Sequence, residues 1–279
     1  MDLARAVSAT ISYANYFNFP LFPKEIHHWL IHSRPVSKNV LKPYLTEKMS
    51  VVNRRYRLQT NKFAKQKILH AQKLIGLLKH FPGLRLIALT GSVAARNAKK
   101  DDDIDLFFIT TPHALWLVRP LVICILTIFF RRRHPLEDPA HAPNAFCPNF
   151  WLDTLSLTID DSKQSLFTAH EVLQIIPLLD RGDTYQSFLK ANAWTKKYLA
   201  NAYLASISIS SVGANHDSPA TIPVSLLLAP LNLIFFLFQF LYMLPKKTTE
   251  TVNLHVAHLH TTDYSSQLDA YLIRDPSGN

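Results

Sequence analysis

Apolar and polar residues alternate with two different periods along this chain, and the change of period predicts an α+β fold. Residues 61–80 repeat their apolar positions with the helical period and place lysines on the opposite face. Two short apolar runs, 84–89 and 104–109, have the length and the branched side chains of strands, and 146–153 is a third candidate strand. The middle of the chain therefore reads as strand, glycine turn, short helix over 93–98, acidic turn and strand.

Residues 1–60 are the first predicted domain. Asp2 precedes a run with helical spacing as an N-cap, Pro23 begins a second helix, and Ser37 caps a third. Residues 50–58 predict a short basic hairpin. Three helices followed by a basic hairpin resemble a winged helix, which implies either contact with nucleic acid or docking of another protein.

Two more predicted domains follow, a small mixed-sheet core over 61–165 and a helical C-terminal region over 166–279. Thr168 is expected to cap a helix in that region, because Glu171 follows it at capping-box spacing. Another helix is expected over 185–202, where aromatic and apolar residues recur at helical spacing. The C-terminal third is thus expected to be largely helical.

An uncharged stretch, 221–244, follows a serine-rich flexible connector near 206–220 and ends before Lys246. Its length alone matches a membrane span, and the lysine fits an anchor at the membrane surface. Its prolines and polar residues such as Asn232 favour the alternative, a helix over 231–244 packed on the core. Both a cytoplasmic protein and a membrane-associated one are open at this point.

Composition narrows the class of protein. The 279-residue chain is long enough for two or three domains, and its formal net charge of +10 and pI near 9.6 indicate an anionic partner such as a nucleotide, a nucleic acid or a membrane surface. Only two cysteines are present, Cys124 and Cys147, and nothing requires a disulfide. The N-terminus lacks the pattern of a signal peptide, so a reducing cytoplasm is the expected location.

The residues that carry chemistry lie between the first two candidate strands. Gly91 and Ser92 follow one strand directly, and Asp103 and Asp105 begin the other. Alternate residues of a strand share a face, so the two carboxylates point the same way and repel each other unless a cation lies between them. Their hard oxygens favour Mg²⁺ or Mn²⁺, and a glycine turn that opens a helix favours a phosphate. The pattern predicts a site for a nucleoside triphosphate and a divalent metal.

The spacing Gly91-Ser92, ten residues, Asp103, one apolar residue, Asp105 resembles the signature of the DNA polymerase beta-like nucleotidyltransferase superfamily. The resemblance implies that Gly91 and Ser92 hold the β- and γ-phosphates and that Asp103 and Asp105 bind the divalent metals, Mg²⁺ or Mn²⁺. It also implies transfer of a nucleoside monophosphate from a nucleoside triphosphate to a hydroxyl, by a two-metal in-line displacement. The acceptor is left open among a small molecule, a protein and RNA.

Two further strings, Cys147-Pro148-Asn149-Phe150 and Asn192-Ala193-Trp194, are similar to segments of uncharacterised bacterial nucleotidyltransferase-domain proteins with an N-terminal winged helix. This likeness extends over most of the chain. It implies a fold and a site, and it implies no particular substrate.

Members of the superfamily normally carry a third carboxylate on a later strand. Asp153, at the end of the candidate strand 146–153, is the first choice for this third catalytic residue. Asn149 is the alternative, and because an amide cannot act as a general base, it would leave a site that binds metal and nucleotide yet turns over slowly or not at all. Arg96, between the glycine turn and the aspartates, is a candidate contact for the triphosphate.

Thirteen histidines raise the question of a transition-metal site. His255, His258 and His260 precede Asp263, but their spacing fits no helical pair of ligands, and the chain lacks the cysteines of a zinc cluster. A partly exposed loop and the start of a helix are the prediction for this segment.

Three functional hypotheses result. The leading one is a magnesium-dependent nucleotidyltransferase. The second is a winged-helix regulator whose transferase-like domain senses nucleotides without reacting, and the third is a membrane-associated scaffold. The first two hypotheses differ in whether Asp153 or Asn149 takes the place of the third carboxylate. The third depends on whether the stretch that ends at Leu244 lies in a membrane.

Overall fold

A six-stranded mixed sheet forms the centre of the computed structural model, which describes residues 2–45, 54–134, 137–210, 222–244, 251–259 and 264–274. The strands are β1 (Leu84–Leu89), β2 (Ile104–Thr110), β3 (Phe146–Asp153), β4 (Ile176–Asp180), β5 (Thr251–Val252) and β6 (Val256–His258). Their order across the sheet is β4-β1-β2-β3-β6-β5; β2 and β3 run parallel, and the other neighbours run antiparallel. The predicted α+β class is confirmed.

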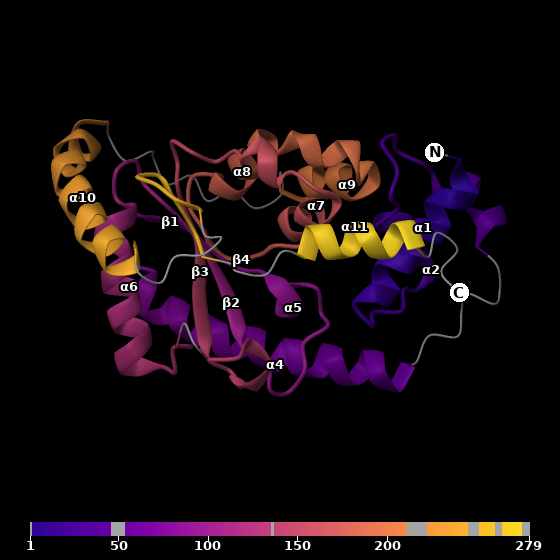
Figure 1. Ribbon diagram of the computed structural model, residues 1–279, viewed down its shortest axis with the longest axis horizontal. Helices are drawn as coiled ribbons and strands as arrows, with labels where there is room; N and C mark the ends of the chain where they lie inside the picture. Colours follow the sequence, from indigo (N-terminus) through magenta and orange to yellow (C-terminus); the bar gives the residue numbers. More distant parts are fainter. Residues whose placement is uncertain are drawn as a thin grey trace.

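Helices cover both faces of this sheet (Figure 1). One face carries α4 (Arg54–Leu78) and α6 (Leu115–Phe129), and the other carries α7 (Leu166–Leu173), α8 (Thr184–Ala191) and α9 (Ala200–Ser210). Strand alternation produces the two cores, since Ile87 and Leu106 pack under α4 and α6 while Leu86 and Phe107 pack under α7 and α8. In the part of the chain that the structure describes, four short 3₁₀ helices complete the connections: Lys42–Tyr44, Pro139–His141, Asp161–Lys163 and Ala193–Lys197.

Three helices begin the chain as predicted, namely α1 (Leu3–Tyr16), α2 (Pro23–His28) and α3 (Lys38–Leu41). The Asp2 carboxylate caps α1 by accepting the Ala4 amide at 2.8 Å. Of the predicted hairpin over 50–58, residues 50–53 lie outside the described part of the chain. Its second half, 54–58, is wrong as a strand, because these residues form the start of α4; no glycine or proline interrupts the helical period there.

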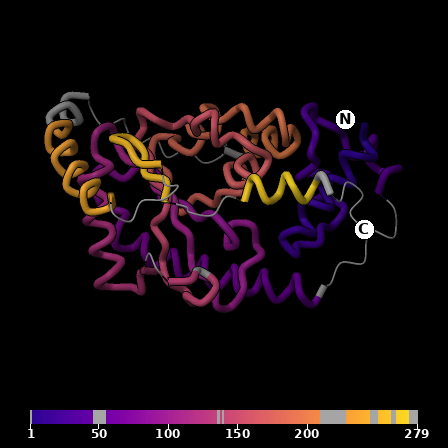
Figure 2. Tube along the Cα trace, in the orientation of Figure 1, coloured from indigo at the N-terminus to yellow at the C-terminus, as the bar shows by residue number. Residues whose placement is uncertain are grey.

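The first and the last described helices of the chain, α1 and α11, lie side by side. Helix α11 (Tyr264–Arg274), yellow in Figure 2, lies against the indigo N-terminal helices. The Tyr16 hydroxyl donates to the Gln267 side chain at 3.2 Å, and the rings of Tyr16 and Tyr271 are 5.1 Å apart. The first predicted domain is therefore in contact with the last segment of the chain.

The region predicted as helical, 166–279, also supplies three strands of the sheet, β4, β5 and β6. These strands are short, and β4 contains Pro177, which an edge strand tolerates because it needs no donor on its outer side. The helix expected over 185–202 is divided into α8 and α9 around Asn192, whose buried side chain donates to Leu157 O and accepts from Ile159 N. Of the expected connector, 206–210 belongs to α9 and 211–220 lies outside the described residues.

Helix α10 (Ile222–Met243) packs on α6. Asn232 Oδ1 accepts the Trp116 amide at 2.8 Å, and Gln239 Oε1 accepts Arg119 Nη1 at 2.8 Å. These contacts pair the side-chain oxygens of the polar residues that favoured a packed helix in the sequence. Within the described ranges, no helix combines the length and the apolar character that crossing a membrane requires.

Candidate functional site

The two aspartates of the predicted site lie together at the start of β2. Ile104, between them, is fully buried on the opposite face of the strand, so both carboxylates face the side of the sheet that α7 covers. One oxygen of each carboxylate and the Cys147 sulfur all lie within 4.8 Å of one another. We call Asp103 and Asp105 the acid pair.

Gly91 brings the turn after β1 against the acid pair. Its φ is +60°, and a Cβ at this position would lie 2.3 Å from Asp105 Oδ2. The neighbouring Thr90 amide donates to the backbone oxygen of Asp105 at 3.2 Å. Glycine fits both the left-handed backbone and the close approach because it has no Cβ. The glycine turn and the acid pair are therefore in direct contact.

Asp103 is nearly buried, with 7% of its side chain exposed, and Arg133 Nε lies 2.7 Å from its Oδ2. The same guanidinium donates from Nη2 to the Cys147 sulfur at 2.8 Å. Burial and the charge of Asp105 raise the pKa of Asp103 to about 8, although Arg133 acts in the opposite direction. The acid pair therefore retains a strong unfavourable interaction that a further cation would relieve.

Glu171, on α7, is a residue of this site that sequence reasoning missed. The Gly91 amide donates to its carboxylate, and burial together with the charge of Asp105 raises the pKa of Glu171 to about 7. The predicted cap at Thr168 is wrong, because Ser165 is the N-cap and its hydroxyl accepts the Thr168 amide at 3.1 Å. Ser165 was the signal in the sequence that could have revealed the role of Glu171. A helix capped by Ser165 places Glu171 beyond the first turn, so Glu171 cannot take part in a capping box.

A bulge in β3 brings Asn149 to the acid pair. Pro148 pairs with Leu106, and Phe150 pairs with the next residue of β2, so Asn149 is the extra residue between them. Its Nδ2 donates to Asp105 Oδ1 at 2.7 Å. Asn149 therefore holds the place beside Asp105 in which the third carboxylate was expected.

Asp153 does not join the acid pair, contrary to its prediction as the third catalytic residue. It pairs with Thr110 at the other end of β2, which is five residues, or roughly 16 Å, along the strand from Asp105. The bulge also shifts the alternation on which the prediction relied. Asp153 instead contacts His255.

The side chain of Lys67, on α4, anchors the loop that carries the aspartates. This ammonium group is almost fully buried, and it donates to three oxygens: Lys100 O at 3.2 Å, Asp102 O at 2.6 Å and Asn144 Oδ1 at 3.1 Å. In the same loop, the Asp102 carboxylate accepts hydrogen bonds from the Ser92 hydroxyl at 3.1 Å and from the Lys99 amide at 2.8 Å. Ser92, predicted to hold phosphate, thus also links the glycine turn to the acidic loop.

Arg96 lies just after α5 (Gly91–Ala94), a helix that begins earlier and is shorter than the one predicted over 93–98. It lines a cavity of about 620 Å³ beside α5, together with Phe22, Trp29, Arg57 and Gln174. The cavity extends from the C-terminal end of α5, at Ala94 and Ala95, to the N-terminal helices.

No protein-family model, no curated protein and no solved structure matches the chain. The assignment of the site therefore rests on its residues and their geometry.

Proposed function

We propose that the chain is a divalent-cation-dependent nucleotidyltransferase that moves a nucleoside monophosphate from a nucleoside triphosphate to a hydroxyl acceptor. One observation carries the proposal, which is the contact between the glycine turn and the acid pair. The Asp105 carboxylate occupies the space that a Cβ of residue 91 would take, so a phosphate bound at the glycine turn would lie beside the oxygens of Asp105. Phosphate and metal would then share one small volume, as phosphoryl-transfer chemistry requires.

The donor set fits a hard divalent cation. Asp103 and Asp105 offer carboxylate oxygens, and the raised pKa of Asp103 reflects a charge that nearby positive groups only partly offset. When bound, Mg²⁺ or Mn²⁺ would offset the charge of the triphosphate and favour ionisation of the attacking hydroxyl. The chain's own residues orient the acids, Arg133 holding Asp103 and Asn149 holding Asp105.

The cavity beside α5 supports a nucleotide as the ligand. Its volume of about 620 Å³ lies within the usual range of small-molecule sites. Trp29 and Phe22 supply aromatic surface on which a base can stack, and Arg96 supplies a cation for the phosphates. We assign the base to this cavity and the triphosphate to the glycine turn.

Release of pyrophosphate tests the proposal. The purified chain is incubated with labelled nucleoside triphosphates, Mg²⁺ and candidate acceptors, beside a variant with Asp103→Asn and Asp105→Asn. Asp101→Asn is the control, because Asp101 is exposed in the same acidic run and its change removes a negative charge without altering the acid pair. We expect release by the wild type and by the control and none by the double variant; equal release by all three would refute the proposal.

A second function, nucleotide sensing without turnover, is favoured by the amide at position 149. Asn149 stands beside Asp105 where a general base is expected, and Glu171 already accepts the Gly91 amide. Asn149→Asp separates the two functions. A sensor should gain pyrophosphate release in this variant because it gains the missing carboxylate, whereas an active wild type that loses activity in the variant would exclude the sensor.

A further inference from the structure

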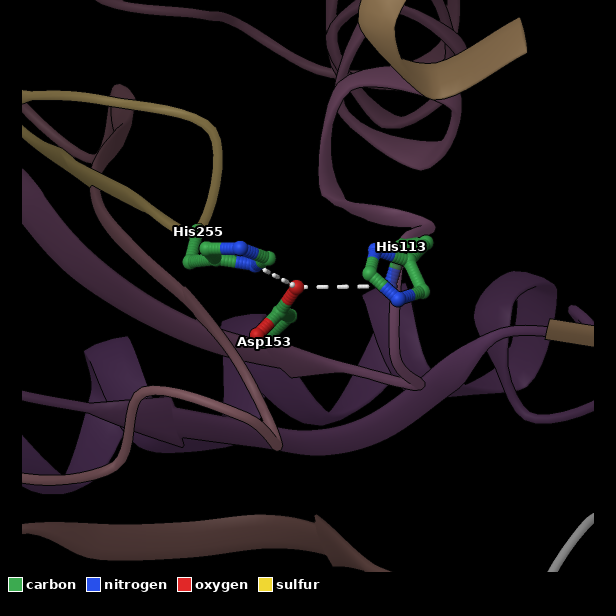
Figure 3. Close-up of side chains that lie close together, drawn as sticks. All are labelled: His113, Asp153 and His255. Carbon is green, nitrogen blue, oxygen red and sulfur yellow. Dashed lines mark hydrogen bonds and ion pairs between the residues drawn. The ribbon is translucent and has the colours of Figure 1, made fainter. Parts of the chain in front are cut away.

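Three side chains from distant parts of the sequence meet at the end of β2 and β3 opposite to the acid pair (Figure 3). His113 lies in the turn between β2 and α6, Asp153 is the last residue of β3, and His255 lies in the turn between β5 and β6. Figure 3 shows the Asp153 carboxylate between the two histidines. We call these residues the histidine cluster.

Asp153 is fully buried, yet it directs a carboxylate oxygen at both histidines. Its Oδ2 lies 2.7 Å from His255 Nδ1 and accepts the backbone amide of His113 at 3.3 Å, while Oδ1 accepts the Leu155 amide at 2.9 Å. A buried carboxylate requires compensation of its charge. Asp153 and His255 share a proton in this contact, and a metal cation can take the place of that proton.

His113 is held in an unfavourable backbone conformation, with φ at +57°. Non-glycine residues adopt this region at some cost in free energy, and such residues often lie at functional sites. Its Nδ1 is buried and has no hydrogen-bond partner within the described part of the chain. The centre of its ring lies 5.6 Å from that of His255. A buried imidazole nitrogen without a partner, next to a carboxylate and a second imidazole, is well placed to bind a metal ion.

The ligand atoms of the three side chains lie within 4.8 Å of one another. Around a tetrahedral metal they would be about 3.3 to 3.5 Å apart, a difference that small side-chain rotations can close. Two imidazoles and one carboxylate suit a divalent transition metal of the zinc class and leave a coordination position open. His255 has 32% of its side chain exposed, which gives an ion a route from solvent.

We propose that the histidine cluster binds one Zn²⁺-class ion and thereby fastens the β5–β6 hairpin to the sheet. The hairpin is otherwise held at this point by Trp116 Nε1, which donates to Asn253 O and Leu254 O at 3.1 Å each, and by the Asp153 amide, which donates to His255 O at 3.0 Å. Metal ligation joins the same three segments through side chains. The site is separate from the acid pair and requires no nucleotide.

Calorimetric titration of the chelator-treated, dialysed full chain with Zn²⁺ tests the proposal. We expect one ion per chain, with an affinity that falls by at least about tenfold in His113→Asn and in His255→Asn. Asparagine tolerates the left-handed backbone at position 113, and His255 is exposed enough for its variant to fold. His141→Asn is the matched control, since His141 Nδ1 lies 2.8 Å from Asp138 Oδ2 in an exposed pair that has no third ligand in the described residues.

Co²⁺ substitution distinguishes the histidine cluster from the acid pair in the unmodified chain. Ligation by two histidines and a carboxylate gives visible d–d absorption without a thiolate charge-transfer band, whereas binding at the acid pair beside Cys147 would add that band. A thermal unfolding midpoint raised by Zn²⁺ in the wild type and the control, and unchanged in the two variants, would support the proposal. Absence of Zn²⁺ binding, equal affinity in all chains, or a Co²⁺ spectrum that shows the thiolate band and is unchanged in the two histidine variants would overturn it.

Discussion

The two ends of the parallel strand pair β2–β3 each bury a carboxylate, and the two carboxylates have opposite neighbours. Asp103 faces a second carboxylate, and burial and that charge raise its pKa to about 8. Asp153 faces two imidazoles instead. The neighbours, rather than the residue type, decide which cation each end suits: oxygen donors suit Mg²⁺, and imidazoles suit Zn²⁺. Position on a strand is therefore a poor guide to the role of an aspartate.

Gly91→Ala should destabilise the protein most, and it acts at the end of β2–β3 that carries the acid pair. The new Cβ would lie 2.3 Å from Asp105 Oδ2 on a backbone with φ of +60°. We expect a loss of about 3 to 4 kcal/mol in the free energy of unfolding, from the strained backbone and the displaced carboxylate. Denaturant unfolding measures this, with Gly76→Ala as the control.

Gly76 lies within α4, and a Cβ added there would meet no atom within 4 Å, so its alanine variant should gain about 0.5 to 1 kcal/mol. Equal unfolding midpoints for the two variants would contradict the close approach at Gly91.

Lys67→Met should loosen the acidic loop with the next largest effect. Three oxygens lose a charged donor, and we expect about 2 to 3 kcal/mol of destabilisation in denaturant unfolding. Lys65→Met, on the exposed side of the same helix, should stay within about 0.5 kcal/mol of the wild type. Similar losses in both variants would mean that the Lys67 contacts do not anchor the loop.

Low pH should weaken α7, the helix that closes the acid end. Burial, together with the charge of His28, lowers the pKa of His170 to about 3, and its ring stacks on Tyr13 at 3.9 Å. A histidine in the unfolded chain titrates near 6.5, so between these values the unfolded state binds a proton that the native state does not. The contribution of His170 to stability, fully present above pH 6.5, is lost as the pH falls, by about 2 kcal/mol at pH 5.

His170→Phe keeps the ring and removes the titration. Between pH 7 and pH 5 the free energy of unfolding of this variant should rise relative to that of the wild type by about 2 kcal/mol. The comparison isolates His170, because the raised pKa values of Asp103 and Glu171 act in the opposite direction in both chains. Parallel pH profiles would show that His170 is not the group responsible.

Trp116→Phe should have the smallest effect on stability, and it acts on the β5–β6 hairpin beside the histidine cluster. The change removes the indole donor to Asn253 O and Leu254 O, at a cost of about 1 to 2 kcal/mol. Hydrogen exchange of the Asp153 amide, which donates to His255 O, should accelerate. In Trp194→Phe, which loses a donor to the Asn192 side chain elsewhere, that amide should keep its protection. Acceleration in both variants would argue against local control of the hairpin by Trp116.

Sequence reasoning predicted the elements around the acid pair well, because their signals are local. Strands β1, β2 and β3 follow from apolar runs, and the shared face of Asp103 and Asp105 follows from strand alternation. The N-terminal helices follow from caps and helical spacing. Each of these features depends on residues that are near neighbours in the chain.

The features that were missed depend on contacts between distant residues. The bulge at Asn149 appears only when β3 pairs with β2, and it cancels the alternation that made Asp153 attractive. Glu171 reaches Gly91 only after α7 packs on the sheet. The histidine cluster joins two turns and the end of a strand, so no spacing in the sequence could reveal it. Of the other residues in the histidine-rich segment, His258 lies in β6 and not in the predicted loop, and His260 and Asp263 lie outside the described residues.

Equilibrium binding of ATP is the most direct test of the central claim, that the acid pair and the glycine turn form one site for a metal and a nucleotide. Calorimetry with and without Mg²⁺ compares the wild type, the Asp103→Asn and Asp105→Asn double variant, and the Asp101→Asn control. The account predicts Mg²⁺-dependent binding by the wild type and the control, and at least about tenfold weaker binding by the double variant, the loss expected when about 1.4 kcal/mol of binding energy is removed. Equal affinity in the three chains, or binding that ignores Mg²⁺, would contradict it.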